Sequence, residues 1–251
     1  MTLGNEDRAQ PVRHSHRAQR AVPGARRMFR LGILATAALG SIGAVAGVAQ
    51  AVTFSDGYSS DSGGIAIANN ETFALSNAQQ QTTFKDSFTI HQYGAVYAAN
   101  VRNDATAESV ACSPDSPCRS VSLSFQIITM AGTDIHLNAV NLSNADNVHC
   151  AGCQAVAGAY QFVVDTPGAF RLSRSAESQL AAIHGKLNAL SDAKLPIDDV
   201  QSQADALAVQ VAAILKTAAA GAPAGGTGIH PLTATAASPS VRVYRDFQQQ
   251  H

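Results

Sequence analysis

The feature that most limits the fold of this chain is an internal repeat, and each copy of it carries a pair of cysteines. The aligned segments are residues 100–112 (NVRNDATAESVAC) with 138–150 (NAVNLSNADNVHC), and 118–128 (CRSVSLSFQII) with 153–163 (CQAVAGAYQFV). Eight of the 24 aligned positions are identical, where ordinary residue frequencies give about one or two. Because there are only two copies, we predict a duplicated strand–Cys loop–strand unit over 97–129 and 135–166, and not a solenoid.

The second half of each copy has the pattern of a β-strand. In the first copy, apolar and polar residues alternate strictly, the apolar set being Val121, Leu123, Phe125 and Ile127 and the polar set Ser120, Ser122, Ser124 and Gln126. This alternation predicts an antiparallel strand with one face in water. In the second copy both faces are largely apolar. We therefore expect that strand to be central, or covered by the helices that follow.

Two helices are predicted after Pro167. Leu180, Ile183, Leu187 and Leu190 recur at helical spacing, and a second stripe runs from Val200 to Ile214. Asp198 and Asp199 stand at the start of the second stripe, where the helix dipole favours acids. The sequence thus predicts a helical hairpin with helices at about 175–191 and 198–216.

The N-terminal region has the three parts of a secretory signal peptide. Seven Arg lie within residues 1–30, residues 31–48 carry no charge, and Ala49-Gln50-Ala51 is a small-residue cleavage site. Arg26-Arg27-Met28-Phe29 resembles a twin-arginine export signal, although Ala25 stands where Ser or Thr is usual. We expect residues 1–51 to be removed and the chain to be exported to the medium or envelope. The alternative is a membrane anchor formed by residues 31–51.

Composition excludes some classes of function. Beyond residue 51 the chain carries ten Lys and Arg against sixteen Asp and Glu, a formal charge of −6. This balance argues against a nucleic-acid partner and leaves the membrane as a partner only through an uncleaved N-terminal segment. Residues 52–82 are rich in Ser, Asp, Gly and Asn, and residues 217–251 in Ala, Gly and Pro. We expect both to be flexible, which leaves an α+β domain over 83–216.

The four cysteines are the candidate site residues, and three interpretations of them stay open. In an oxidising compartment they would form two local disulfides, Cys112–Cys118 and Cys150–Cys153. Alternatively, all four thiolates would bind one structural zinc. A third possibility is a redox-active Cys150-Ala151-Gly152-Cys153 pair. The compartment favours the disulfides, and then no cofactor or metal is expected.

No sequence motif points to catalysis. The chain has no His-Glu-x-x-His, no Gly-x-Ser-x-Gly and no phosphate-binding loop. His91, His136, His184 and His230 show no ligand spacing, so we expect surface or strand histidines. We identify no catalytic residue, and we expect a protein that is not an enzyme.

The segment from Cys150 to Gln161, preceded by its copy, resembles a group of exported actinobacterial proteins of unknown function. These proteins carry repeated Cys-x-x-Cys units that lead into an aromatic-Gln strand, and some are labelled putative peptide zinc metalloproteases. The resemblance covers about residues 85–215. The longer Cys112–Cys118 spacer departs from the pattern, and the chain lacks the metal motif that the label requires.

Together these features predict an α+β fold, in which a small antiparallel sheet built from the duplicated unit is followed by a helical hairpin. The expected function is that of an exported, non-catalytic structural or interaction protein of the envelope or medium, with an envelope protein as a possible partner. The alternative is a thiol-redox or zinc-binding accessory domain that uses the paired cysteines.

Overall fold

The computed structural model of the chain describes residues 53–57, 64–193, 195–223 and 238–251. The leader predicted at 1–51 lies outside these residues. The strands and helices are β1 (Thr53–Gly57), β2 (Gly64–Asn77), β3 (Thr82–Val110), β4 (Arg119–Ala131), β5 (His136–Val148), β6 (Gln154–Thr166), α1 (Arg174–Ala189), α2 (Ile197–Ala220) and β7 (Ser240–Gln250). This is a mixed α+β fold with two helices in its C-terminal part.

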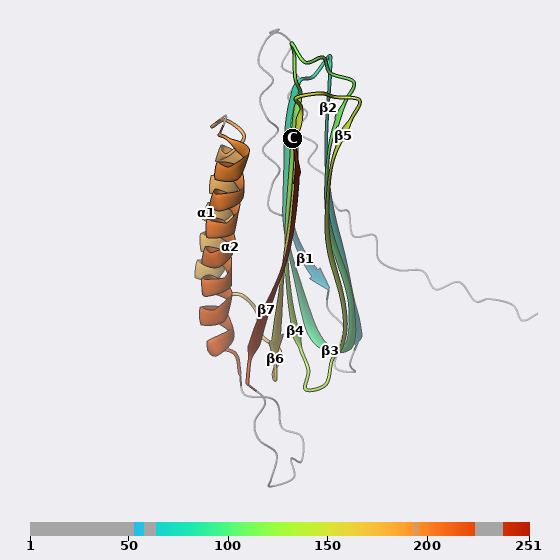
Figure 1. Ribbon diagram of the computed structural model, residues 1–251. Coiled ribbons are helices and arrows are strands. Elements are labelled where there is room, and N and C mark those ends of the chain that lie inside the picture. The colour runs from blue at the N-terminus through green and yellow to red at the C-terminus, as the bar shows by residue number, and fades with distance from the viewer. Residues whose placement is uncertain (1–52, 58–63, 194, 224–237) are drawn as a thin grey trace, which may run out of the picture. The chain divides into compact units, whose positions relative to one another are not determined.

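The long strand β3 belongs to two sheets. The helix-facing sheet contains, in order, β1, residues 82–95 of β3, β4, β6 and β7. The outer sheet contains β2, residues 96–110 of β3, and β5. Figure 1 shows the layers: the two helices, then the sheet with β4, β6 and β7, then the layer with β2 and β5.

The prediction of a small antiparallel sheet is wrong. The sheet system has seven strands, and every pair is parallel except β6 with β7. From β2 to β6 the chain passes alternately through the outer and the helix-facing sheet, so each turn stacks on the one before it. This is the path of a parallel β-solenoid of three short coils, which the presence of only two detectable sequence copies had argued against.

The strand register places aligned repeat residues beside one another. In the outer sheet Asn100 lies beside Asn138 and Asn103 beside Asn141. In the helix-facing sheet Gln126 of β4 lies beside Gln161 of β6. Parallel stacking with this register turns sequence similarity into rows of like side chains.

The polar face of β4, which we expected to lie in water, is buried between the two sheets. Ser120, Ser122 and Ser124 are fully buried. Their hydroxyls find partners on the outer sheet: Ser120 with Ser76 at 2.7 Å, and Ser122 with the Thr72 carbonyl at 2.9 Å. Serine is small enough for the close approach of two sheets, and these bonds offset the cost of burying a hydroxyl.

Three asparagines form a ladder through the same interior. Asn70 Nδ2 donates to Asn103 Oδ1 at 3.0 Å, and Asn103 Nδ2 donates to Asn141 Oδ1 at 2.9 Å. Asn141 Nδ2 then donates to the Ala159 carbonyl of β6 at 2.9 Å. Each coil contributes one amide, so the ladder fixes the register of the outer sheet and ties it to the helix-facing sheet.

The apolar face of the helix-facing sheet is covered by α1 and α2, as expected for the second copy. Phe88, Phe125 and Tyr160 stack across β3, β4 and β6, with ring centroids 5.8 and 4.5 Å apart. Leu180 and Leu187 of α1 are completely buried in the same core. Burying each such side chain stabilises the fold by about 1.5–3 kcal/mol.

Two segments predicted to be flexible contain strands. In the polar segment, β2 turns Ala66, Ala74 and other small residues inward. These side chains are too small or too polar for hydrophobicity to indicate a buried face. In the C-terminal segment, β7 pairs with β6 and is held by an ion pair between Arg242 and Asp165 at 3.1 Å. Both strands depend on partners far away in the sequence.

The helices begin and end within a few residues of the expected bounds. Asp198 and Asp199 lie in the first turn of α2, as predicted. Within the described residues, no helix is long and apolar enough to cross a membrane.

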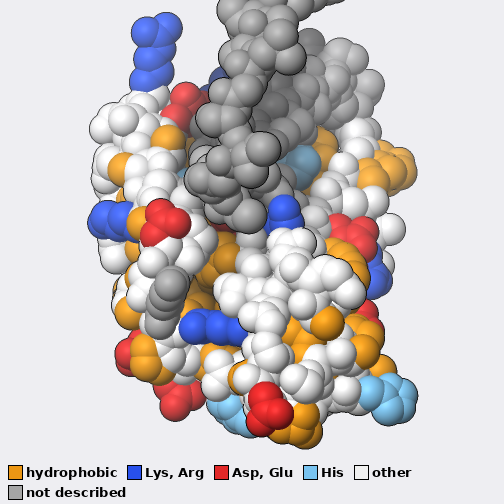
Figure 2. Space-filling model, turned by 90° about the horizontal axis from the view of Figure 1, so that it is seen from above, with side chains coloured by type: hydrophobic (Ala, Val, Ile, Leu, Met, Phe, Trp, Pro, Cys, Tyr) orange, Lys and Arg blue, Asp and Glu red, His pale blue; other side chains and the backbone are white. Residues whose placement is uncertain are grey.

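In the end-on view of Figure 2, charged side chains of both signs are scattered singly among uncharged and hydrophobic ones.

Candidate functional site

All four candidate cysteines lie at one end of the coils. Cys112 and Cys118 lie in the loop from β3 to β4, and Cys150 and Cys153 lie in the loop from β5 to β6. Both loops carry the chain from the outer sheet to the helix-facing sheet. The cysteines form the two local disulfides of the first interpretation, Cys112–Cys118 with Cα atoms 5.9 Å apart and Cys150–Cys153 with Cα atoms 5.5 Å apart.

The two loops make the same turn just before their first cysteine. Ala111 has φ of 55° and His149 has φ of 50°, both in the left-handed region. These residues occupy equivalent positions of the repeat, and the Ala111 amide donates to the Val148 carbonyl at 3.0 Å. Left-handed backbone is unfavourable for residues with a Cβ, and in each loop it is followed directly by a disulfide.

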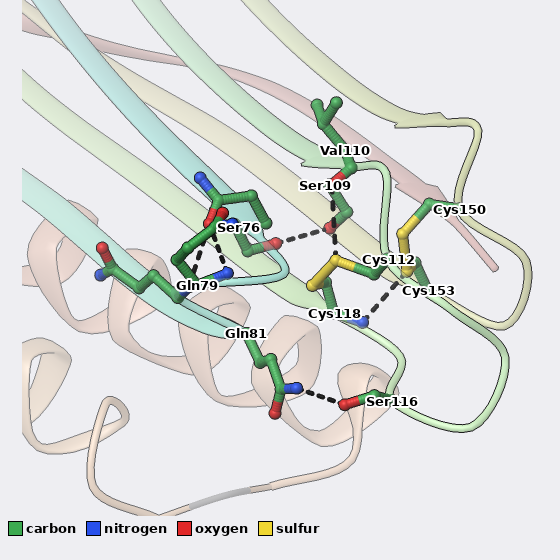
Figure 3. The surroundings of a disulfide bond; sticks show 12 residues. Ser76, Gln79, Gln81, Ser109, Val110, Cys112, Ser116, Cys118, Cys150 and Cys153 are labelled. Carbon is green, nitrogen blue, oxygen red and sulfur yellow. Dashed lines mark hydrogen bonds between the residues drawn. A yellow bond between two sulfur atoms is a disulfide. The ribbon is translucent and has the colours of Figure 1, made fainter.

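The disulfides stack on each other because the coils do. The Cys118 amide donates to Cys153 Sγ at 3.0 Å, and the Gln154 amide donates to the Cys118 carbonyl at 2.9 Å. All four sulfur atoms lie within 4.8 Å of one another, and all four residues are buried. Figure 3 shows the two sulfur–sulfur bonds side by side at the ends of the strands.

This geometry can do two things. As disulfides, each cysteine pair closes its own loop, so the turns of two successive coils are each held in place. If reduced, they would offer four thiolates in one cluster, which is the donor set of a structural zinc site. The two pairs are separated by 31 residues in the sequence, and the stacking of the coils brings them together.

A second polar cluster lies beneath α1, and sequence analysis missed it. His184 is not a surface histidine: it is 3% exposed, and its Nε2 lies 3.1 Å from Asp86 Oδ2 of β3. Asn188, with its amide nitrogen towards Asp86, donates to both carboxylate oxygens at 2.7 and 2.8 Å. The signal was present, because His184 stands four residues after Leu180 and three before Leu187 on the buried stripe. Buried beneath the helix, this cluster ties α1 to the sheet.

A third cluster joins α2, β6 and β7. Asp205 accepts hydrogen bonds from the Tyr160 hydroxyl at 2.9 Å and from Arg245 at 2.8 Å. Burial, and then the Asp205 carboxylate, raise the pKa of Tyr160 well above its usual value. The phenol is therefore a permanent donor near neutral pH. Its place between the helix layer and the sheet makes it a structural contact.

An open groove lies where the start of α1 meets the end of α2. Its volume is about 790 Å³, and it is lined by Phe170, Arg171, Gln179, Ile214 and Thr217 among others. Only a few polar side chains reach it, and none of the three clusters described above does. The cysteine cluster thus remains the candidate site with the most definite chemistry.

Comparisons with known proteins add no identity to this geometry. No protein-family model matches the chain, and no curated protein and no solved structure matched it either. The interpretation of the site therefore depends on its residues alone.

Proposed function

We propose that the chain is an exported, non-catalytic structural or interaction protein of the cell envelope or medium. The observation that carries this proposal is the pair of stacked disulfides at the turns of two successive coils. Disulfides of this kind persist in oxidising compartments and are rare in the cytosol. The Arg-rich start, the uncharged run and Ala49-Gln50-Ala51 agree with the same compartment.

We further infer that residues 97–129 and 135–166 are a duplicated coil. The register supports this, because Asn103 and Asn141 are both aligned in sequence and adjacent in space. The left-handed residues Ala111 and His149 are equivalent in the same way. Duplication of a coil is a simple route to a longer stack, since a new coil can reuse the same ladder contacts.

The proposed role agrees with where the polar side chains lie. The Asn ladder, the buried Ser row and the two helix-side clusters are each engaged in holding layers together. The outer sheet instead presents apolar side chains to solvent, among them Ile67 and Phe73. Where exposed apolar side chains form a contiguous patch, they are typical of a surface that binds another protein.

Export is tested on protein recovered from a culture of the native host. N-terminal sequencing should begin at Val52. Full-length protein found only in the membrane fraction would instead favour an anchor at 31–51. The paired substitution Arg26→Lys and Arg27→Lys should stop export by the twin-arginine route, and continued secretion would exclude that route.

The state of the cysteines is tested on the same material. Thiol counting after denaturation should find no free thiol, and non-reduced peptide mapping should find Cys112 joined to Cys118 and Cys150 joined to Cys153. Cross-pairing between the loops, or four free thiols in the exported protein, would contradict the structural role that we propose for them.

The second candidate function is a zinc-binding or redox accessory domain. The clustering of the four sulfur atoms within 4.8 Å of one another favours it. A dithiol reductant would supply four electrons and four protons to the two disulfides, and one Zn²⁺ would then displace the protons from the four thiols. Zinc bound with a stoichiometry of one after reduction would support this function. The matched control is Cys150→Ser with Cys153→Ser, which should abolish tight zinc binding after reduction, because only the two thiols of Cys112 and Cys118 remain.

The suspected membership in the exported actinobacterial group also stays a proposal. It rests on the Cys-x-x-Cys unit that leads into Tyr160-Gln161. The buried position of Gln161, whose amide donates to Gln126 Oε1 at 2.8 Å, gives that motif a structural reason. The same reason would apply to any protein built from stacked coils of this kind.

A further inference from the structure

The two disulfides form one cluster, although each closes its own loop. All four sulfur atoms lie within 4.8 Å of one another. Cys118 directly precedes β4 and Cys153 directly precedes β6, and the first residues of these two strands are paired in the parallel register. The Gln154 amide also donates to the Cys118 carbonyl at 2.9 Å. Cys118 and Cys153 are therefore neighbours across two successive coils.

Neighbouring positions of this kind are compatible with a disulfide. Adjacent strands of a sheet lie about 4.8 Å apart, and the two Cα atoms of a disulfide usually lie about 4.4–6.8 Å apart. The same backbone path thus admits two pairings: the observed one within each loop, and one between the loops that joins Cys118 to Cys153. A cluster that admits two pairings can exchange one for the other once a single thiolate is present.

The four cysteines differ in their access to solvent. Cys150 and Cys112 are 9% and 5% exposed, whereas Cys118 and Cys153 are 1% and 0% exposed. Cys150 also lies between two exposed loop residues. A reductant that approaches from solvent would therefore reach the Cys150–Cys153 bond at Cys150, and the sulfur that leaves would be that of Cys153.

The leaving sulfur already accepts a hydrogen bond from the neighbouring coil. The Cys118 amide donates to Cys153 Sγ at 3.0 Å (Figure 3). This donor would stabilise the negative charge that develops on Cys153 when its bond to Cys150 breaks. The Asn147 side chain donates to the Cys153 carbonyl at 2.9 Å and fixes the backbone at the same position. The released thiolate would therefore stay beside the Cys112–Cys118 bond.

We propose that the cluster is a disulfide-exchange site whose substrate is a dithiol reductant. One thiolate of the reductant attacks Cys150 Sγ and expels the Cys153 thiolate. The second thiolate of the reductant then attacks the mixed disulfide and releases Cys150, so the reductant leaves as a disulfide. The Cys153 thiolate attacks Cys118 Sγ, the Cys112–Cys118 bond breaks, and Cys112 leaves as a thiolate. This inference deepens the redox part of the second candidate function and rests on it.

The product is one disulfide between coils and two thiols. The two electrons and two protons of the reductant end on Cys112 and Cys150, the more exposed cysteines, where the thiols are nearer to water. Cys112 Sγ lies 3.4 Å from the Val110 carbonyl, which can accept from the protonated thiol. The two most buried sulfurs are joined as Cys118–Cys153. Limited reduction therefore ties two successive coils together, whereas full reduction would release both loops.

The test uses the purified full-length chain with both disulfides formed. One equivalent of dithiothreitol is added, all free thiols are then blocked with N-ethylmaleimide in denaturant, and the peptides are mapped without reduction. We expect labels on Cys112 and Cys150, and a peptide in which Cys118 is joined to Cys153. Labels on Cys150 and Cys153, with the Cys112–Cys118 bridge intact, would overturn the proposal.

The matched control is Cys112→Ser with Cys118→Ser, which removes the accepting disulfide but keeps the backbone amide that donates to Cys153. One equivalent of dithiothreitol should label Cys150 and Cys153 equally in this control, whereas the native chain should lose most of the label on Cys153. Equal labelling of Cys153 in both chains would overturn the exchange alone. A Cys150–Cys153 bond that stays closed in both chains would contradict the redox function itself, so the two failures are distinguishable.

A second variant tests whether the bond between coils fits the fold. Cys112→Ser with Cys150→Ser leaves only Cys118 and Cys153. After air oxidation this chain should contain no free thiol and should keep the circular dichroism of the native chain. Two free thiols in a chain with native circular dichroism would overturn the proposal.

Discussion

The substitution Asn103→Ala should be among the most damaging small changes in this chain. Asn103 is fully buried, donates to Asn141 Oδ1 at 2.9 Å and to the Ser124 carbonyl at 3.2 Å, and accepts from Asn70 at 3.0 Å. Truncation removes the donor that Asn103 supplies to Asn141 Oδ1 and to the Ser124 carbonyl. At about 1–3 kcal/mol for each unsatisfied buried group, the free energy of unfolding should fall by about 2–4 kcal/mol.

The control for this change is Asn100→Ala, three residues earlier on the same strand. Asn100 also belongs to an aligned pair, but it is exposed, and its contact with Asn138 is 3.3 Å long. Its loss should cost no more than about 0.5 kcal/mol. Urea denaturation followed by circular dichroism, with the disulfides intact, should show a midpoint about 1–2 M lower for Asn103→Ala only. Equal midpoints for the two variants would refute the buried ladder.

Three other outcomes follow from the packing. Leu187→Asp should destabilise the fold by about 3 kcal/mol or more in the same urea assay, whereas Val209→Asp at a position 70% exposed should be nearly neutral, and similar losses would contradict the helix orientation. The raised pKa of Tyr160 contributes stability below about pH 10 that is lost as the pH rises above it, so Tyr160→Phe should unfold with less dependence on alkaline pH than the native chain. His149→Gly should raise the free energy of unfolding by about 0.5–1 kcal/mol, which calorimetry can check, because it relieves a left-handed residue.

Sequence patterns located most of the elements but not their arrangement. Periodicity alone was enough to predict a helix through Leu180 and Leu187 and a strand through Phe125. The local backbone sets these periods, so no long-range contact is needed to recognise them. Ser122 and Ser124 show the limit of that reasoning. A row of serines is compatible with water or with a tightly packed second sheet, and only long-range pairing decides between them.

The same limit applies to the candidate site. Local loop closure made the Cys112–Cys118 and Cys150–Cys153 pairs predictable. Their approach to within 4.8 Å was not, since it follows from parallel stacking of the coils. The full length of strand β2 was not predicted, because its inward residues are small or polar, as at Asn70. Its apolar residues point outward, which reverses the usual signal of a buried strand.

The fold depends on the parallel stacking of the coils in the observed register. Nuclear Overhauser contacts between backbone protons test this stacking most directly. A coil pairs β4 with β6, whereas a hairpin would pair β4 with β5. We predict contacts that join β4 to β6 in parallel, with Phe125 beside Tyr160, and side-chain amide contacts between Asn103 and Asn141. Antiparallel contacts between β4 and β5, the strands joined by residues 132–135, would contradict the coil and restore the antiparallel sheet expected from sequence.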